Sequence, residues 1–109
     1  MSILKEIEHG YETQFGNEAN LKFRATVRCN SLLGYWAAQK LGITGPETRQ
    51  YARDIVEGDL ENPEADGVFK RIRADFDDKG VIFSDHQLRR TMDEFMSRAL
   101  AELKGATGV

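Results

Sequence analysis

The chain has 109 residues, of which 40% are hydrophobic and 30% are charged. This length and balance predict a single globular domain with a modest core. The chain has 15 Lys and Arg residues against 18 Asp and Glu residues, which gives a net charge of -3. Binding along a nucleic acid needs a basic surface, so this charge argues against nucleic acid as the main partner.

The start of the chain lacks the apolar run of a signal peptide, and no stretch approaches the roughly 18 apolar residues of a membrane span. We therefore expect a cytoplasmic protein with no direct membrane insertion. The single cysteine, Cys29, cannot form an internal disulfide, which fits a reducing compartment. It lies on the apolar face of a predicted helix, so we expect an inert core thiol.

The first predicted helix covers residues 19–41. Its main apolar stripe repeats every three or four positions and consists of Leu21, Ala25, Cys29, Leu32 and Trp36. Gly34 lies inside this helix, where a glycine costs about 1 kcal/mol. We expect it to allow the close approach of a neighbouring helix.

The second predicted helix covers residues 45–60. Gly42 stops the first helix, and Thr44-Gly-Pro-Glu47 matches a capping box with a proline in the first turn. The predicted buried side consists of Tyr51, Ala52, Ile55 and Val56, continued by Leu60.

Two further helices follow. Asn62 is predicted to cap the third, with Pro63 in its first turn and Gly80 at its end. Its apolar residues are Ala65, Val68, Phe69, Ile72 and Phe76. Ser84-Asp-His-Gln87 is another capping box and predicts a fourth helix over residues 85–104. Its apolar residues are Leu88, Met92, Phe95, Met96, Ala99, Leu100 and Leu103.

The predicted fold class is therefore all-α, a single-domain four-helix bundle with a flexible N-terminal arm. The expected bounds are 1–17 for the arm, 18–104 for the bundle and 105–109 for a disordered tail. If the arm became helical, one apolar stripe would contain Leu4, Ile7, Tyr11 and Phe15. An isolated helix of this length is marginal in water, so it suits folding against a partner's groove. The alternative is an extra turn packed on the chain's own bundle.

Candidate catalytic and metal-binding motifs are nearly absent. His9 and His86 lack the spacing of a metal pair, and neither a phosphate-binding loop nor a nucleophile elbow occurs. Residues 75–82 match the opening of a calcium loop, but Lys79 stands at a ligand position and His86 replaces the closing glutamate. We expect no metal site and no enzymatic activity.

Two sets of polar residues are candidates for binding an anion. Lys70, Arg71 and Arg73 form a basic cluster that could contact phosphates or an acidic partner, although such a cluster is more often a solvated face. The other set lies on the first helix and consists of Arg24, Arg28 and Asn30, with Trp36 two turns further on. Structural roles are the alternative for these residues too.

The segment from Arg28 to Gly42 reads Arg-Cys-Asn-Ser-Leu-Leu-Gly-Tyr-Trp-Ala-Ala-Gln-Lys-Leu-Gly. It resembles the zeta subunit family, inhibitors and regulators of the F-type ATP synthase of alpha-proteobacteria. The resemblance continues through Thr44-Gly-Pro-Glu47 and Asp59-Leu-Glu61, and returns to the arm at Tyr11-Glu12 and Phe15.

This resemblance implies a four-helix bundle without catalysis, peripheral to the inner membrane through the ATP synthase. It implies that the arm enters a catalytic subunit interface and blocks ATP hydrolysis, with the alpha, beta and gamma subunits as partners. The expected binding residues of the arm are Leu4, Ile7, Tyr11, Glu12 and Phe15. No cofactor is required, but the resemblance implies that ADP or ATP binds to the bundle, and we assign Arg28, Asn30 and Trp36 to it.

Gly10, Gln14 and Gly16 replace residues that are more helix-favouring or basic in typical inhibitory members. Each glycine costs about 1 kcal/mol of helix formation. The alternative function is therefore an adenine-nucleotide-binding sensor with little or no inhibitory activity. A DNA-binding protein that uses the second and third helices is a third hypothesis, which the acidic charge disfavours.

Overall fold

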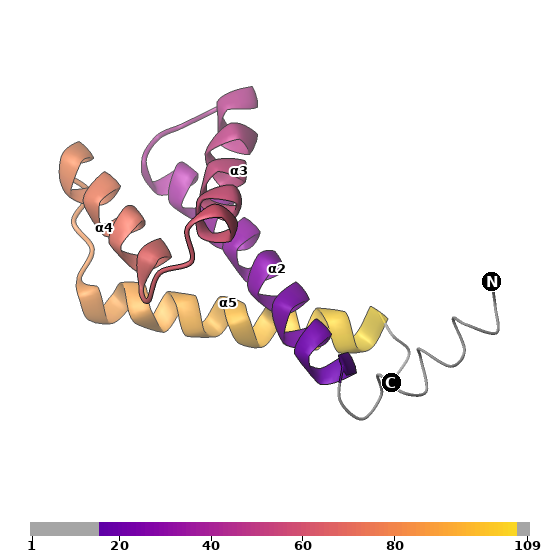
Figure 1. Cartoon of the computed structure of the whole chain (residues 1–109). Coiled ribbons are helices and arrows are strands. Elements are labelled where there is room, and N and C mark those ends of the chain that lie inside the picture. The colour runs from indigo at the N-terminus through magenta and orange to yellow at the C-terminus, as the bar shows by residue number, and fades with distance from the viewer. Residues whose placement is uncertain (1–15, 107–109) are drawn as a thin grey trace.

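The structure is a computed structural model that describes residues 16–106, and this part of the chain is all-α (Figure 1). The four helices are α2 (Gly16–Lys40), α3 (Pro46–Glu61), α4 (Gly67–Lys79) and α5 (Asp85–Ala106). The predicted all-α class and four-helix bundle are confirmed. The arm residues Leu4, Ile7, Tyr11, Glu12 and Phe15 lie outside the described residues.

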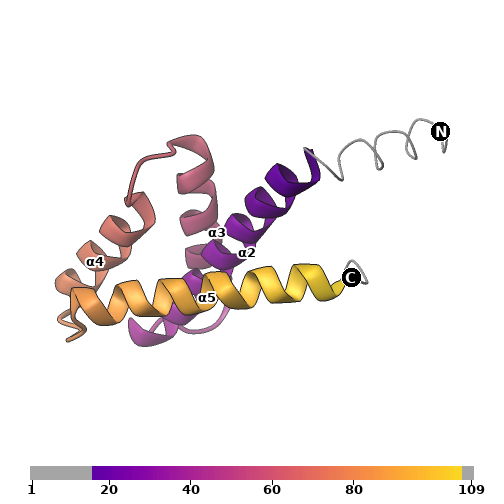
Figure 2. The same ribbon diagram turned by 90° about the horizontal axis from the view of Figure 1, so that it is seen from below.

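Helix α2 is the centre of the fold. Figures 1 and 2 show that it crosses α5, and that its first turns lie at the same end of the molecule as the last turns of α5. One row of buried residues on α2 repeats every four positions and consists of Ala25, Cys29, Leu33 and Ala37, and Leu41 continues it just after the helix ends. Leu33 is fully buried whereas Leu32 is half-buried, so the predicted stripe was wrong at this position.

A second buried row on α2 faces α3 and contains Asn30, Gly34 and Ala38. Gly34 lies directly against Ala52 of α3: a Cβ atom on Gly34 would be 2.5 Å from the Ala52 Cα atom. The predicted close approach at Gly34 is therefore confirmed. Residues four positions apart form ridges on a helix, and such ridges fit into the grooves of a neighbouring helix. The two rows are therefore the surfaces through which α2 packs against its neighbours.

The turn between α2 and α3 differs from the prediction. Pro46 is the first residue of α3, as expected, but the N-cap is Gly45 and no side chain caps the helix. Gly42 and Gly45 both have positive φ angles, 81° and 68°, which a glycine adopts without strain. The capping box at Thr44 was therefore wrong, because backbone geometry rather than a hydroxyl makes this turn.

The start of the third predicted helix was also wrong. Asn62 is the C-cap of α3, and α4 begins only at Gly67 with Asp66 as its N-cap. Asp66 has a φ angle of 63°, and its carboxylate accepts hydrogen bonds of 2.8 and 3.1 Å from Arg89 of α5. This contact across 23 positions places the start of α4. Leu60 and Ala65, predicted to be buried, are exposed.

The ends of α4 and α5 agree better with the sequence. Gly80 ends α4 in the left-handed conformation, as predicted. Ser84 and Gln87 form the predicted capping box, with each backbone N–H donating to the other side chain at 3.0 Å. Helix α5 reaches Ala106, so it extends past the predicted boundary at residue 104.

Cys29 is buried on α2, and its burial raises the thiol pKa from 9.0 to about 11, with a smaller contribution from Asp93. We expect the folded protein at pH 8 to react with a thiol reagent at least about 100-fold more slowly than the urea-unfolded chain, because the thiolate is the nucleophile. Equal labelling rates in the folded and unfolded states would contradict a buried, inert thiol.

The raised pKa of Cys29 also makes the free energy of unfolding depend on pH. The contribution that requires a neutral thiol is fully present below pH 9 and is lost as the pH rises through 11.

Candidate functional site

Arg28, the first of the predicted binding residues on α2, faces α5. Its Nε atom donates to Glu102 Oε1 at 3.0 Å, and Arg98 donates to the other carboxylate oxygen at 3.2 Å. These hydrogen bonds, that of Arg28 first, hold the pKa of the Glu102 carboxyl below its usual value. The Arg28 side chain is still 49% exposed, so solvent reaches it beside this contact.

Asn30 lies on another face of α2 and points to α3. Only 6% of the residue is exposed, and its side-chain amide donates to Asp59 Oδ2 at 2.9 Å. A buried amide of this kind requires a hydrogen-bond partner, and Asp59 supplies it. The pair joins the middle of α2 to the last turn of α3.

Trp36 has no part in either contact, because it belongs to an aromatic cluster in the core. Its ring centroid lies 5.2 Å from that of Phe83, 5.7 Å from Phe76 and 6.4 Å from Phe95. The structure therefore does not bring Arg28, Asn30 and Trp36 together. Arg24 is exposed on α2. The nucleotide assignment of these residues stays a prediction.

The basic cluster on α4 is engaged in ion pairs with carboxylates of this chain. Lys70 pairs with Glu64 at 3.3 Å, and Arg71 pairs with Asp75 at 2.9 Å. Arg73 pairs with two carboxylates, of Asp77 and Asp85, and also donates to the backbone carbonyl of Phe83. These contacts support the structural interpretation of the cluster, since Arg73 holds the α4–α5 loop in place.

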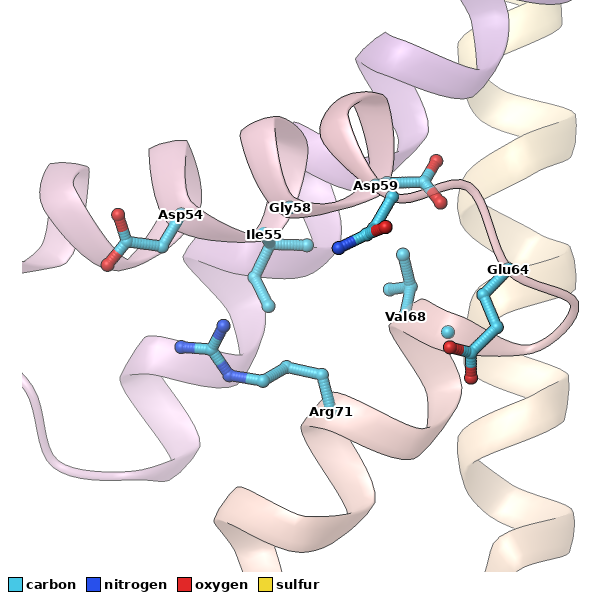
Figure 3. Close-up of a pocket in the computed structure, with 9 residues that line it drawn as sticks. Asp54, Ile55, Gly58, Asp59, Glu64, Val68 and Arg71 are labelled. Atoms are coloured by element: carbon cyan, nitrogen blue, oxygen red, sulfur yellow. The ribbon is translucent and has the colours of Figure 1, made fainter.

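A cavity of about 180 Å³ lies between α3 and α4 (Figure 3). Ile55 and Val68 reach into it from the two helices, and Arg71 extends across from α4. The Arg71 guanidinium also lies 5.5 Å from the centre of the Tyr51 ring, while the Tyr51 hydroxyl donates to Asp75 at 2.6 Å. The guanidinium of Arg71, the cationic group that lines this cavity, is therefore already paired with Asp75.

A larger cleft of about 280 Å³ opens beside Asn30, between α2, α4 and α5. Four carboxylates line it, those of Asp59, Glu64, Asp66 and Asp93. Phosphate groups are repelled by carboxylates, so this cleft is poorly suited to the phosphates of a nucleotide. In residues 16–106 no group of acidic, histidine or cysteine side chains could hold a metal ion.

The residues that resembled a calcium loop have a different conformation. Residues 75–79 lie within the last turns of α4, and Asp75 and Asp77 accept hydrogen bonds from arginines of the same helix. A calcium loop wraps its oxygen ligands around the ion and cannot be helical at these positions.

None of the helices from Gly16 to Ala106 has the length and apolar character needed to cross a membrane.

A third hollow, of about 250 Å³, has a mainly apolar lining and lies between α2 and the last turns of α3. We name it the α2–α3 groove, and its residues are Phe23, Thr26, Val27, Asn30, Val56, Asp59, Leu60 and Pro63. Phe23 and Leu60 are 56% and 49% exposed. Both are large apolar side chains that their neighbours leave exposed, so the groove is a candidate contact surface.

The family model described as ATPase inhibitor subunit zeta matches residues 1–102 of this chain. The chain belongs to the ATPase inhibitor subunit zeta family. No curated protein sequence matches it. The zeta model covers α2, α3, α4 and α5 up to residue 102, and also the N-terminal segment that precedes α2, so the family assignment does not rest on the bundle alone.

The segment from Arg28 to Gly42, which resembles the zeta family in sequence, occupies the second half of α2 and the turn after it. Its residues pack the helices together, because Gly34 lies against Ala52 and Trp36 belongs to the aromatic cluster. Sequence reasoning missed Asp59 and Glu102, the partners of Asn30 and Arg28. An asparagine on an apolar helix face predicts a buried partner, but only the fold identifies it.

Proposed function

We propose that this zeta-family chain inhibits ATP hydrolysis by the F-type ATP synthase. In this proposal residues 1–15 fold as a helix and insert at an interface between catalytic subunits, with the alpha, beta and gamma subunits as partners. The observation that carries the proposal is the match to ATPase inhibitor subunit zeta, which begins at residue 1 and includes this segment.

The physical basis is that a rotary enzyme must change the shape of its catalytic interfaces in every cycle. A helix bound to one shape of an interface opposes the change to the next, so binding energy alone can stop hydrolysis. The segment has a suitable surface, because Leu4, Ile7, Tyr11 and Phe15 fall within one stripe at 100° per residue. The start of α2, which follows this segment in the sequence, lies at one end of the described helices (Figure 1).

The test replaces two apolar residues of the stripe by serine in the full chain, which leaves the net charge unchanged. Ile7→Ser with Tyr11→Ser is expected to raise the half-inhibitory concentration for ATP hydrolysis by at least about 100-fold, since two buried apolar side chains are worth about 3 kcal/mol or more. The matched control is His9→Ser with Thr13→Ser, on the opposite face of the same helix. Equal inhibition by the two variants would refute the proposal.

A bound adenine nucleotide is a second proposal, and Arg28 is the residue that supports it best. Its side chain is half-exposed, and the guanidinium could bind a phosphate if it exchanged its contact with Glu102. We expect addition of ADP to shift the backbone amide signals near Arg28 and Glu102, and Arg28→Ala to weaken binding by about tenfold. An absence of shifts at millimolar ADP would reject this nucleotide site.

A further inference from the structure

The α2–α3 groove and the cleft lined by four carboxylates adjoin each other, because both are lined by Thr26, Asn30 and Asp59. We call the two together the composite groove. Along α2 it extends from Phe23 to Leu33, which is ten positions or about 15 Å of helix. A partner helix of about three turns has the same length.

The acidic end of the composite groove carries negative charge that this chain only partly neutralises. Glu64 and Asp66 each form an ion pair, one with a lysine of α4 and the other with an arginine of α5. Asp59 accepts a hydrogen bond from the neutral Asn30 amide, and Asp93 forms no ion pair within residues 16–106. Two carboxylates therefore remain for the cations of a partner.

Both ends of the composite groove also present apolar surface. At one end Phe23 and Leu60 are about half exposed. At the acidic end the carboxylates surround apolar side chains, which are Leu33, Val68, Phe69, Met92 and Met96. Methionine side chains are flexible and adapt to the shape of a bound partner. An apolar groove edged by carboxylates is complementary to a helix with one apolar face and a basic flank.

The charge of the groove also distinguishes between possible occupants. Residues 1–15 of this chain contain one lysine and three glutamates, so the acidic end would repel them. A second copy of the chain has a net charge of -3 and is disfavoured for the same reason. The complementary occupant is therefore a basic segment of a different protein.

We propose that the composite groove binds a basic amphipathic helix of a partner protein. Apolar residues of that helix lie against Phe23 and Leu60, and at least two of its Lys or Arg residues lie beside Asp59 and Asp93. This contact leaves residues 1–15 free, so the bundle can hold one partner while the segment binds elsewhere. The proposal does not depend on the proposed inhibitory function.

A pair of peptides tests the proposal with the full chain, followed by its backbone amide signals. The probe is a helical peptide of about fourteen residues with leucine on one face and lysine on the other. We expect it to shift the signals of residues 26–33, 59–68 and 92–96. The matched peptide with every lysine replaced by glutamate should bind at least about tenfold more weakly. Equal affinity for the two peptides, or shifts confined to residues 1–15, would overturn the proposal.

Four exposed positions provide variants and their controls. Leu60→Ser is expected to weaken binding of the leucine–lysine peptide about tenfold, and Asp93→Asn about threefold, because each removes one contact of the groove. Ile82→Ser in the α4–α5 loop and Glu94→Gln, next to Asp93 but outside the groove, should change the affinity by less than about twofold. Unchanged affinity in Leu60→Ser and Asp93→Asn, or equal losses in the controls, would contradict binding at this site.

Discussion

Gly34→Ala is expected to destabilise the fold by about 3 kcal/mol, a large effect for the addition of one methyl group. The new Cβ atom would lie 2.5 Å from the Cα atom and 2.9 Å from the Cβ atom of Ala52. Backbone of α3 cannot yield locally, so the α2–α3 crossing must open as a whole. The midpoint of urea unfolding, followed by the helical circular dichroism signal, measures the loss.

Gly58→Ala is the matched control, because Gly58 also lies inside a helix but a Cβ atom there would meet no atom within 4 Å. Alanine is the better helix former, so this variant is expected to gain about 1 kcal/mol. The opposite signs distinguish close packing from helix propensity. Similar changes in the two variants would show that α2 and α3 do not cross at Gly34.

Phe76→Ala is expected to cost about 3–5 kcal/mol of stability, the usual range for removing a buried phenylalanine ring. Phe76 is fully buried, and its ring packs against those of Trp36 at 5.7 Å and Phe83 at 5.9 Å. The chain has one tryptophan, so its fluorescence reports on this cluster directly. Ile82→Ala, at an exposed position nearby in the sequence, should change stability by less than about 0.5 kcal/mol. A comparable loss from both would contradict the aromatic core.

The helices were predictable from sequence because their apolar residues repeat with the helical period. The departures arise where a contact distant in sequence decides the local structure. Asp66 caps α4 in a left-handed conformation, with its carboxylate paired to Arg89 of α5, and no local pattern near Asn62 or Pro63 reveals this. Leu33 is buried in place of Leu32 because α2 packs against both α3 and α5, which broadens its buried surface.

The candidate site was less predictable than the fold. Arg28, Asn30 and Trp36 lie close in sequence, but they lie on different faces of α2 and have different neighbours. Helical geometry alone separates Arg28 from Asn30 by about 200° around the axis. The α2–α3 groove could not be predicted, because Phe23 and Leu60 come together only through the crossing of two helices.

The account of function depends on residues 1–15, which the zeta family match includes. The surfaces of the bundle include an acidic cleft, a cavity whose arginine is already paired, and an apolar groove. In the proposed function inhibition belongs to residues 1–15, and the bundle carries this segment.

The most direct test is the rate of ATP hydrolysis by the cognate ATP synthase, titrated with the full chain and with a chain that lacks residues 1–15. A chain that lacks residues 107–109 serves as the control for truncation. The account predicts that the full chain and the control inhibit alike, and that removal of residues 1–15 abolishes inhibition while the helical circular dichroism signal of the bundle persists. Equal inhibition by the folded chain without residues 1–15 would contradict it.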